Sequence, residues 1–168
     1  QDEFDITSCQ EMQVDHAFTL PMALLWPDQA WPVKVVPVCI NTVQFPLPSA
    51  RRCYALGESV GRAIRGWDSD ARVAVMGTGG LSHQLDGQRA GFINKDFDLR
   101  FMDSLVDDPK WATQFSTHEL VEKAGTQGVE LLMWLATRGA LGSSARCLHR
   151  NYHLPISNTA SGLMLLVP

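Results

Sequence analysis

A histidine suited to proton exchange follows a glycine-rich turn near the middle of the chain. The segment Gly77–Gln84 (GTGGLSHQ) comes directly after the apolar run 71–76, which we expect to form a strand. Ligand sites of open α/β sheets lie at such strand ends, and histidine titrates near neutral pH. His83 is therefore a candidate general acid or base. The same pattern also fits a histidine that only hydrogen-bonds within its loop.

Two other functions are conceivable for this glycine-rich segment. A dinucleotide-binding fingerprint requires GxGxxG, and the residues Leu81–His83 do not supply its final glycine, so the match fails. A nucleophile elbow requires GxSxG, and Gln84 replaces its final glycine. A serine hydrolase that uses Ser82 remains a weaker hypothesis.

Glu130 is the second candidate, because it lies in the apolar stretch Gly128–Ala136. A buried carboxylate is costly unless it is paired or bound to a metal, although the start of a helix favours negative charge. One carboxylate and two histidines form the facial triad of non-haem Fe(II) oxygenases. Glu130 is thus either a metal ligand or a first-turn glutamate that is partly solvated or paired with an arginine.

Two further positions carry polar groups in apolar or near-terminal surroundings. His16 follows Asp15 in the segment 12–18 and is either a core histidine or a functional one. The run Pro155–Ser161 contains Ser157 and precedes an apolar strand. Its hydroxyl and amide groups could hold a polar substrate group, or they could simply cap and turn the chain.

The surrounding pattern predicts an α/β fold, in one domain spanning residues 1–168, with a mostly buried central sheet flanked by helices. We expect strands at 33–40, 71–76 and 162–167, with Pro37 marking a bulge or an edge in the first. Ser49 can cap a helix that runs to about Trp67. Further helices are expected at 95–106, 117–124 and 127–140.

The composition of the chain bears on which binding partners and which cellular compartment to expect. The net charge is −4 and basic residues form no run longer than Arg51–Arg52, so we expect no nucleic-acid partner. No apolar stretch approaches the roughly 20 residues that span a bilayer, and the acidic start does not resemble a signal peptide. The four scattered cysteines lack a CxxC pair, which favours reduced thiols in a cytoplasmic protein.

Several of these segments, taken in order, resemble the class III extradiol ring-cleavage dioxygenases, and most of all the β subunits of protocatechuate 4,5-dioxygenases. The resemblance runs through nearly the whole chain, and the GTGGLSHQ element is its most specific part. The matching segments are 15–18, 39–48, 51–57, 77–84, 89–94, 129–134 and 155–159.

The resemblance implies cleavage of protocatechuate, gallate, methylgallate or a related catechol by O2 at an Fe(II) centre. It implies that Glu130 is an iron ligand, His83 the acid or base of the pocket and His16 a second pocket histidine. It also implies that Ser157 helps to hold the carboxylate on the ring. A small helical α subunit that covers the pocket, in a hetero-oligomer, is a further implication.

One departure from the family pattern bears on the metal. The family's two iron-ligating histidines lie in an N-terminal segment that nothing in these 168 residues matches. We therefore expect the chain to be the C-terminal portion of the catalytic domain, since it also lacks an initiator methionine. The alternatives are a fragment completed by a partner, or a non-catalytic assembly or regulatory subunit that no longer binds iron.

Overall fold

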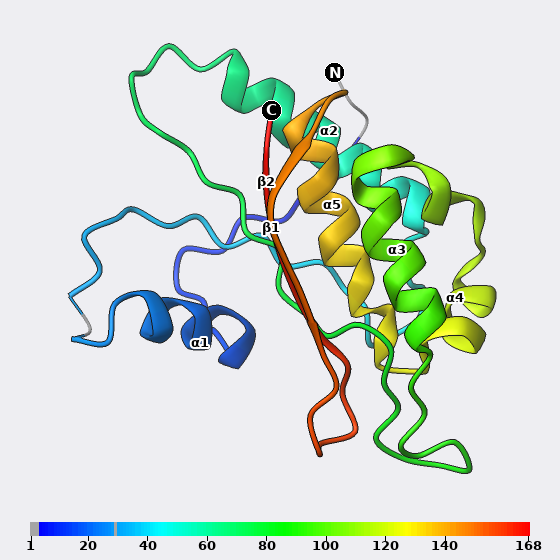
Figure 1. Ribbon diagram of the computed structural model, residues 1–168. Helices are drawn as coiled ribbons and strands as arrows, with labels where there is room; N and C mark the ends of the chain where they lie inside the picture. Colours follow the sequence, from blue (N-terminus) through cyan, green and yellow to red (C-terminus); the bar gives the residue numbers. More distant parts are fainter. Residues whose placement is uncertain (1–3, 29) are drawn as a thin grey trace. The chain divides into compact units, whose positions relative to one another are not determined.

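The computed structural model describes residues 4–28 and 30–168, and the chain divides into two compact units, Gln1–Ile40 and Asn41–Pro168. Helices and a terminal sheet are both present, which confirms the α/β class (Figure 1). Among the described residues, no helix combines the length and the apolar character that crossing a bilayer demands. The elements of the second unit are α2 (Ala50–Arg65), α3 (Lys95–Asp107), η1 (Trp111–Gln114), α4 (Thr117–Ala124), η2 (Gly128–Glu130), α5 (Leu131–Leu141), β1 (Arg146–His153) and β2 (Ser161–Val167).

The first unit contains one helix, α1 (His16–Leu25), among its described residues. The Asp15 carboxylate accepts from the Ala17 N–H at 2.9 Å, which satisfies a free donor at the helix start. The strand predicted at 33–40 was wrong: no described residue pairs with it, and Val36 is 84% exposed. A β-branched run supplies strand propensity, but a strand also requires a neighbour for its backbone groups.

The predicted helices of the second unit are confirmed. Two of them begin at serine residues that cap the helix start. The Ser49 hydroxyl accepts from the Arg52 N–H at 3.2 Å at the start of α2. Ser116 and Glu119 form a reciprocal capping box at the start of α4. The helix predicted at 127–140 begins as the 3-10 turn η2 and continues as α5.

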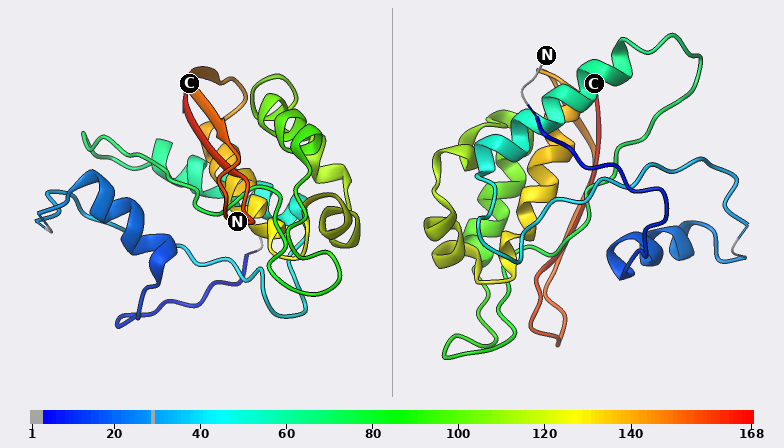
Figure 2. Two further views of the ribbon diagram at one scale, coloured as in Figure 1. Left: turned by 60° about the horizontal axis from the view of Figure 1, so that its bottom comes forward. Right: turned by 180° about the vertical axis from the view of Figure 1, so that it is seen from behind.

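Helix α2 packs directly along α5, as Figure 1 shows and Figure 2 shows from behind. Glycines make this close approach possible. A Cβ at Gly57 would lie 1.8 Å from the Ala136 carbonyl oxygen, and one at Gly61 would lie 2.2 Å from that of Ala140. Because α5 follows Glu130 directly, this packing sets where that carboxylate is held.

The sheet differs from the predicted central one. It consists of β1 and β2, paired antiparallel with Arg146 opposite Val167 and a bulge between Cys147 and His149. The strand predicted at 162–167 is confirmed. The strand predicted at 71–76 is wrong, because that run is exposed and pairs with none of the described residues. Strand β1 was not predicted, since its polar sequence RCLHRNYH lacks the apolar alternation of a half-buried strand.

Candidate active site

The loop that carries His83 is held on both sides by backbone hydrogen bonds. The Leu81 N–H donates to the Ala160 carbonyl at 3.0 Å, next to the start of β2. The His83 N–H donates to the Ala124 carbonyl at 2.8 Å, at the end of α4, and the Gly128 N–H donates to the His83 carbonyl at 3.2 Å. The loop therefore joins the sheet to the junction between α4 and α5, although its residues form only an isolated bridge to Thr159.

His83 itself is buried, with 4% of its surface exposed. Its Nδ1 lies 2.8 Å from the Leu81 carbonyl oxygen. A carbonyl oxygen only accepts hydrogen bonds, so Nδ1 must carry the hydrogen in the neutral ring. The Nε2 atom then holds the lone pair. Proton exchange with a bound molecule would therefore take place at Nε2.

Glu130 contacts the same loop from the start of α5. Its Oε2 accepts from the Gly80 N–H at 2.7 Å. The Trp134 indole N–H, one turn further along α5, donates to the Gly79 carbonyl at 3.0 Å. The carboxylate is only half-buried, which fits both a metal ligand and a partly solvated glutamate in the first turn of a helix.

The two glycines of this turn lie between Glu130 and His83. A Cβ at Gly79, where φ is +130°, would lie 2.7 Å from the Glu130 Cβ, and one at Gly80 would lie 2.9 Å from the His83 Cε1. A side chain at position 79 would overlap Glu130, and one at position 80 would overlap His83. The structure thus brings His83 and Glu130, 47 positions apart in the sequence, to opposite sides of one glycine pair.

The other two candidate residues, Ser157 and His16, are both exposed. Ser157 is exposed in the bend between β1 and β2, while Thr159 of the same segment bridges to His83. His16 is exposed at the first position of α1 in the first unit, so its relation to His83 stays a prediction.

Ser82 cannot serve as an exposed nucleophile, so the serine hydrolase hypothesis was wrong. Its side chain is fully buried, and its Oγ donates to the Asp98 Oδ2 at 2.6 Å and accepts from the Asn94 N–H at 2.8 Å. A nucleophilic serine needs an adjacent base and access to a substrate carbonyl. The Nδ1 of the neighbouring His83 is instead engaged with Leu81.

Asp98 and Tyr152 complete this buried group, and sequence reasoning missed both. Burial raises the pKa of the Asp98 carboxyl, against the lowering effect of its hydrogen bonds from Ser82 and Tyr152. Burial also raises the pKa of the Tyr152 hydroxyl, and the Asp98 charge adds to that effect. Aspartate is common in the first turn of a helix, where it interacts favourably with the helix dipole. In the sequence Asp98 therefore looks ordinary, and only its burial in the structure marks it as different.

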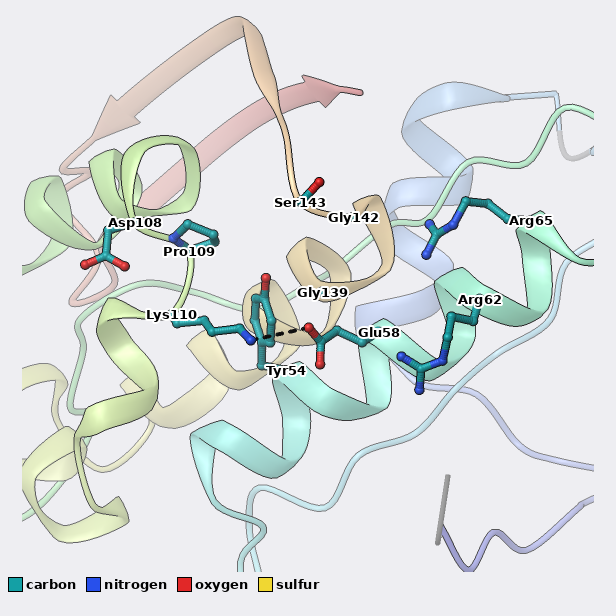
Figure 3. A pocket seen from close by; sticks show the side chains of 10 residues that line it. All are labelled: Tyr54, Glu58, Arg62, Arg65, Asp108, Pro109, Lys110, Gly139, Gly142 and Ser143. Carbon is teal, nitrogen blue, oxygen red and sulfur yellow. Dashed lines mark ion pairs between the residues drawn. The ribbon is translucent and has the colours of Figure 1, made fainter. Parts of the chain in front are cut away.

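A separate cavity of about 460 Å³ lies between α2 and the end of α5 (Figure 3). Tyr54, Glu58, Arg62 and Lys110 line it, and the Lys110 ammonium pairs with the Glu58 carboxylate at 3.6 Å. Neither His83 nor Glu130 contributes to this cavity.

The metal expected at Glu130 would need more ligands than the described residues bring together. Residues 4–28 and 30–168 contain no group of three His, Cys, Asp or Glu side chains that could hold a metal ion. A facial site for ferrous iron requires two histidines beside the carboxylate. Glu130 would supply the carboxylate of such a site.

Comparison with known families identifies the family of this chain. The family model described as the catalytic LigB subunit of aromatic ring-opening dioxygenase matches residues 1–162. The chain belongs to the LigB family. Proteins with sequences similar to this LigB chain include the gallate dioxygenase of Pseudomonas putida KT2440, which is 41% identical over 165 residues, 98% of this chain.

Another relative of this LigB chain is the 2,3-dihydroxyphenylpropionate/2,3-dihydroxicinnamic acid 1,2-dioxygenase of Xanthobacter autotrophicus. It is 30% identical over 206 residues, covering 95% of this chain and 65% of the relative. The corresponding enzyme of Photorhabdus laumondii is 42% identical over 80 residues, 47% of this chain and 24% of the relative. The chain spans about half the length of the gallate dioxygenase, of which the match covers 48%.

Proposed function

We propose that the protein containing this chain is a non-haem Fe(II)-dependent extradiol dioxygenase, which opens the ring of a catechol with O2 in the degradation of aromatic compounds. One observation carries the proposal. A buried histidine with its Nε2 lone pair available lies across a glycine pair from a half-buried carboxylate, in a chain of the LigB family.

The proposed roles follow from the chemistry of each group. His83 exchanges a proton with a catechol hydroxyl at Nε2, because Nδ1 is committed to the Leu81 carbonyl. Glu130 is one iron ligand, and its bond to the Gly80 N–H fixes the direction of the carboxylate. We assign His16 as a second pocket histidine and Ser157 as a contact of the substrate's ring substituent.

We propose gallate or a similar carboxylated catechol as the substrate. The gallate dioxygenase is 41% identical over 98% of the chain, whereas the dihydroxyphenylpropionate enzyme that covers 95% of the chain is 30% identical. Protocatechuate, which differs from gallate by one ring hydroxyl, is the nearest alternative. Comparing turnover of the two substrates tests this choice directly.

The iron site also requires ligands from elsewhere, so we propose that polypeptide outside this chain supplies the two remaining histidines. A small helical α subunit that covers the pocket in a hetero-oligomer, and a cytoplasmic location, are part of the same proposal.

A second candidate function is a non-catalytic assembly or regulatory subunit of the same fold. The absence of a three-ligand group among the described residues favours it. Such a protein would bind neither iron nor catechol with measurable strength, so the same measurements separate the two candidates.

The test compares three variants of the protein expressed from its complete gene. We expect Glu130→Ala to lose iron and His83→Phe to keep iron but lose turnover of gallate. The exposed His118, paired with Glu122 on α4, offers a matched control, and His118→Phe should resemble the wild type. Equal iron content in the wild type and Glu130→Ala would disprove the ligand assignment. A wild type without iron or ring cleavage would favour the second candidate.

A further inference from the structure

A buried carboxylate on α3 accepts three hydrogen bonds from groups around the His83 loop. Asp98 is 1% exposed. Its Oδ1 accepts from the Ser82 N–H at 2.9 Å, and its Oδ2 accepts from the Ser82 hydroxyl at 2.6 Å and from the Tyr152 hydroxyl at 2.8 Å. Helix α3 and strand β1 thereby meet at the residue that precedes His83.

Ser82 connects Asp98 to His83. Both its N–H and its hydroxyl are bonded to Asp98, and its Oγ also accepts from the Asn94 N–H at the start of α3. Because Ser82 and His83 share a peptide bond, fixing the Ser82 backbone restricts the direction of the His83 Cα–Cβ bond. The imidazole then reaches the Leu81 carbonyl, which sets its tautomer.

Stability alone does not account for a carboxylate at this place. Burial raises the pKa of the Asp98 carboxyl, so the charged form is held at a cost to the folded state. An apolar residue of similar size would avoid that cost, as buried ionic groups often show when they are replaced. Three donors aimed at one carboxylate instead fix the geometry of the loop, since hydrogen bonds to charged groups are short and directional.

We infer that Asp98 is a positioning residue: acting through Ser82, and oriented by Tyr152, it holds the loop that presents Nε2 of His83 to the substrate. The catalytic part of this inference rests on the proposed dioxygenase function. The positioning part concerns only the loop and can be tested without any turnover.

The first test measures amide hydrogen exchange in this chain. Asp98→Ala should accelerate exchange at the Leu81 and His83 amides by roughly tenfold or more, because a hydrogen bond to a charged group is lost. The acceptors of these two amides, the Ala160 and Ala124 carbonyls, are unchanged by the substitution. Faster exchange there therefore reports loosening of the loop.

Asp96→Ala provides the matched control. Asp96 is an exposed carboxylate in the same first turn of α3, so its removal has the same effect on helix charge. Unchanged exchange in Asp98→Ala, or equal acceleration in both variants, would overturn the inference. If Asp98→Ala does not fold, Tyr152→Phe removes one of the three bonds and should give a smaller acceleration. No acceleration in that variant would equally overturn it.

The second test measures turnover in the protein expressed from its complete gene. We expect Asp98→Ala to lower kcat at least tenfold while KM and iron content stay near wild-type values. Asp98→Asn keeps an oxygen for the Ser82 N–H and should recover most of the loss. A fall in iron content that matches the fall in kcat would refute positioning of His83. If the wild type shows no ring cleavage, the dioxygenase proposal fails, and the exchange measurement still decides the role of Asp98 in the loop.

Discussion

Replacing Gly57 by alanine tests the packing of α2 against α5 directly. The added Cβ would lie 1.8 Å from the Ala136 carbonyl oxygen and 3.0 Å from the Ala140 N, both on α5. Ordinary contacts of a Cβ begin at 3.4 Å. Because both partners are helix backbone, no side chain can rotate away, and the two helices must separate.

The expected cost is a balance of two terms. Overpacking of a closely packed interior typically costs about 1–3 kcal/mol. Separating the helices by even 1 Å, on the order of the shift required, also forfeits a large part of each dispersion contact along the interface. Alanine has a better helix propensity than glycine by about 1 kcal/mol, which acts in the opposite direction. We expect a net loss of about 2 kcal/mol.

Thermal unfolding followed by circular dichroism measures this loss. A chain of this size should lose roughly 2–4 °C in Tm per kcal/mol, so Gly57→Ala should melt roughly 4–8 °C below the wild type. Gly66→Ala is the control, since a Cβ there meets only the Arg62 carbonyl at 3.3 Å and that of Ala63 at 3.9 Å. A Gly57→Ala variant as stable as the wild type would show that α2 and α5 do not approach this closely.

Three further outcomes are expected. Burial raises the pKa of the Cys53 thiol to about 11, so a thiol reagent at pH 8 should modify the exposed Cys9 and Cys39 and reach Cys53 only after unfolding; early labelling of Cys53 would contradict its burial. The raised pKa of Asp98 means that its contribution to stability is full below its unfolded value, near 3.8, and is lost as pH rises through the folded value. In urea unfolding, the stability of Asp98→Asn relative to the wild type should therefore increase as the pH is raised from about 3.5 to about 7. A stability difference that stays constant over this range would refute the sign. Gly79→Ala should disturb Glu130 and lower iron content in the protein from the complete gene. Gly87→Ala, also at positive φ but with the added Cβ in ordinary contact with the Gln84 Nε2 at 3.7 Å, should not.

The helices could be predicted because their ends are specified locally. Ser49, Asn94 and Ser116 each accept a hydrogen bond from the first turn of the helix that follows. Capping depends on residues about three positions apart, so the sequence alone is sufficient to predict where these helices begin. Helix α1 was missed because Pro21 lies inside it, and proline within a helix normally argues against the assignment.

Strands depend on partners that no local pattern specifies. The runs 33–40 and 71–76 have strand propensity but remain unpaired among the described residues, while the polar β1 is a strand because β2 pairs with it. Asp98 was missed for a related reason. Its three hydrogen-bond donors come from Ser82 and Tyr152, 16 and 54 positions away, and the sequence of α3 does not indicate them.

A pair of glycines lies against both the histidine and the glutamate, which come from very different stretches of sequence. A Cβ on Gly80 would lie 2.9 Å from the imidazole of His83, and a Cβ on Gly79 would lie 2.7 Å from the Glu130 Cβ. The Gly80 N–H also holds the carboxylate. The absence of side chains at these two positions is thus as necessary as the presence of the polar ones. A chain with histidine and glutamate at the same spacing, but alanines at 79 and 80, should not assemble this arrangement.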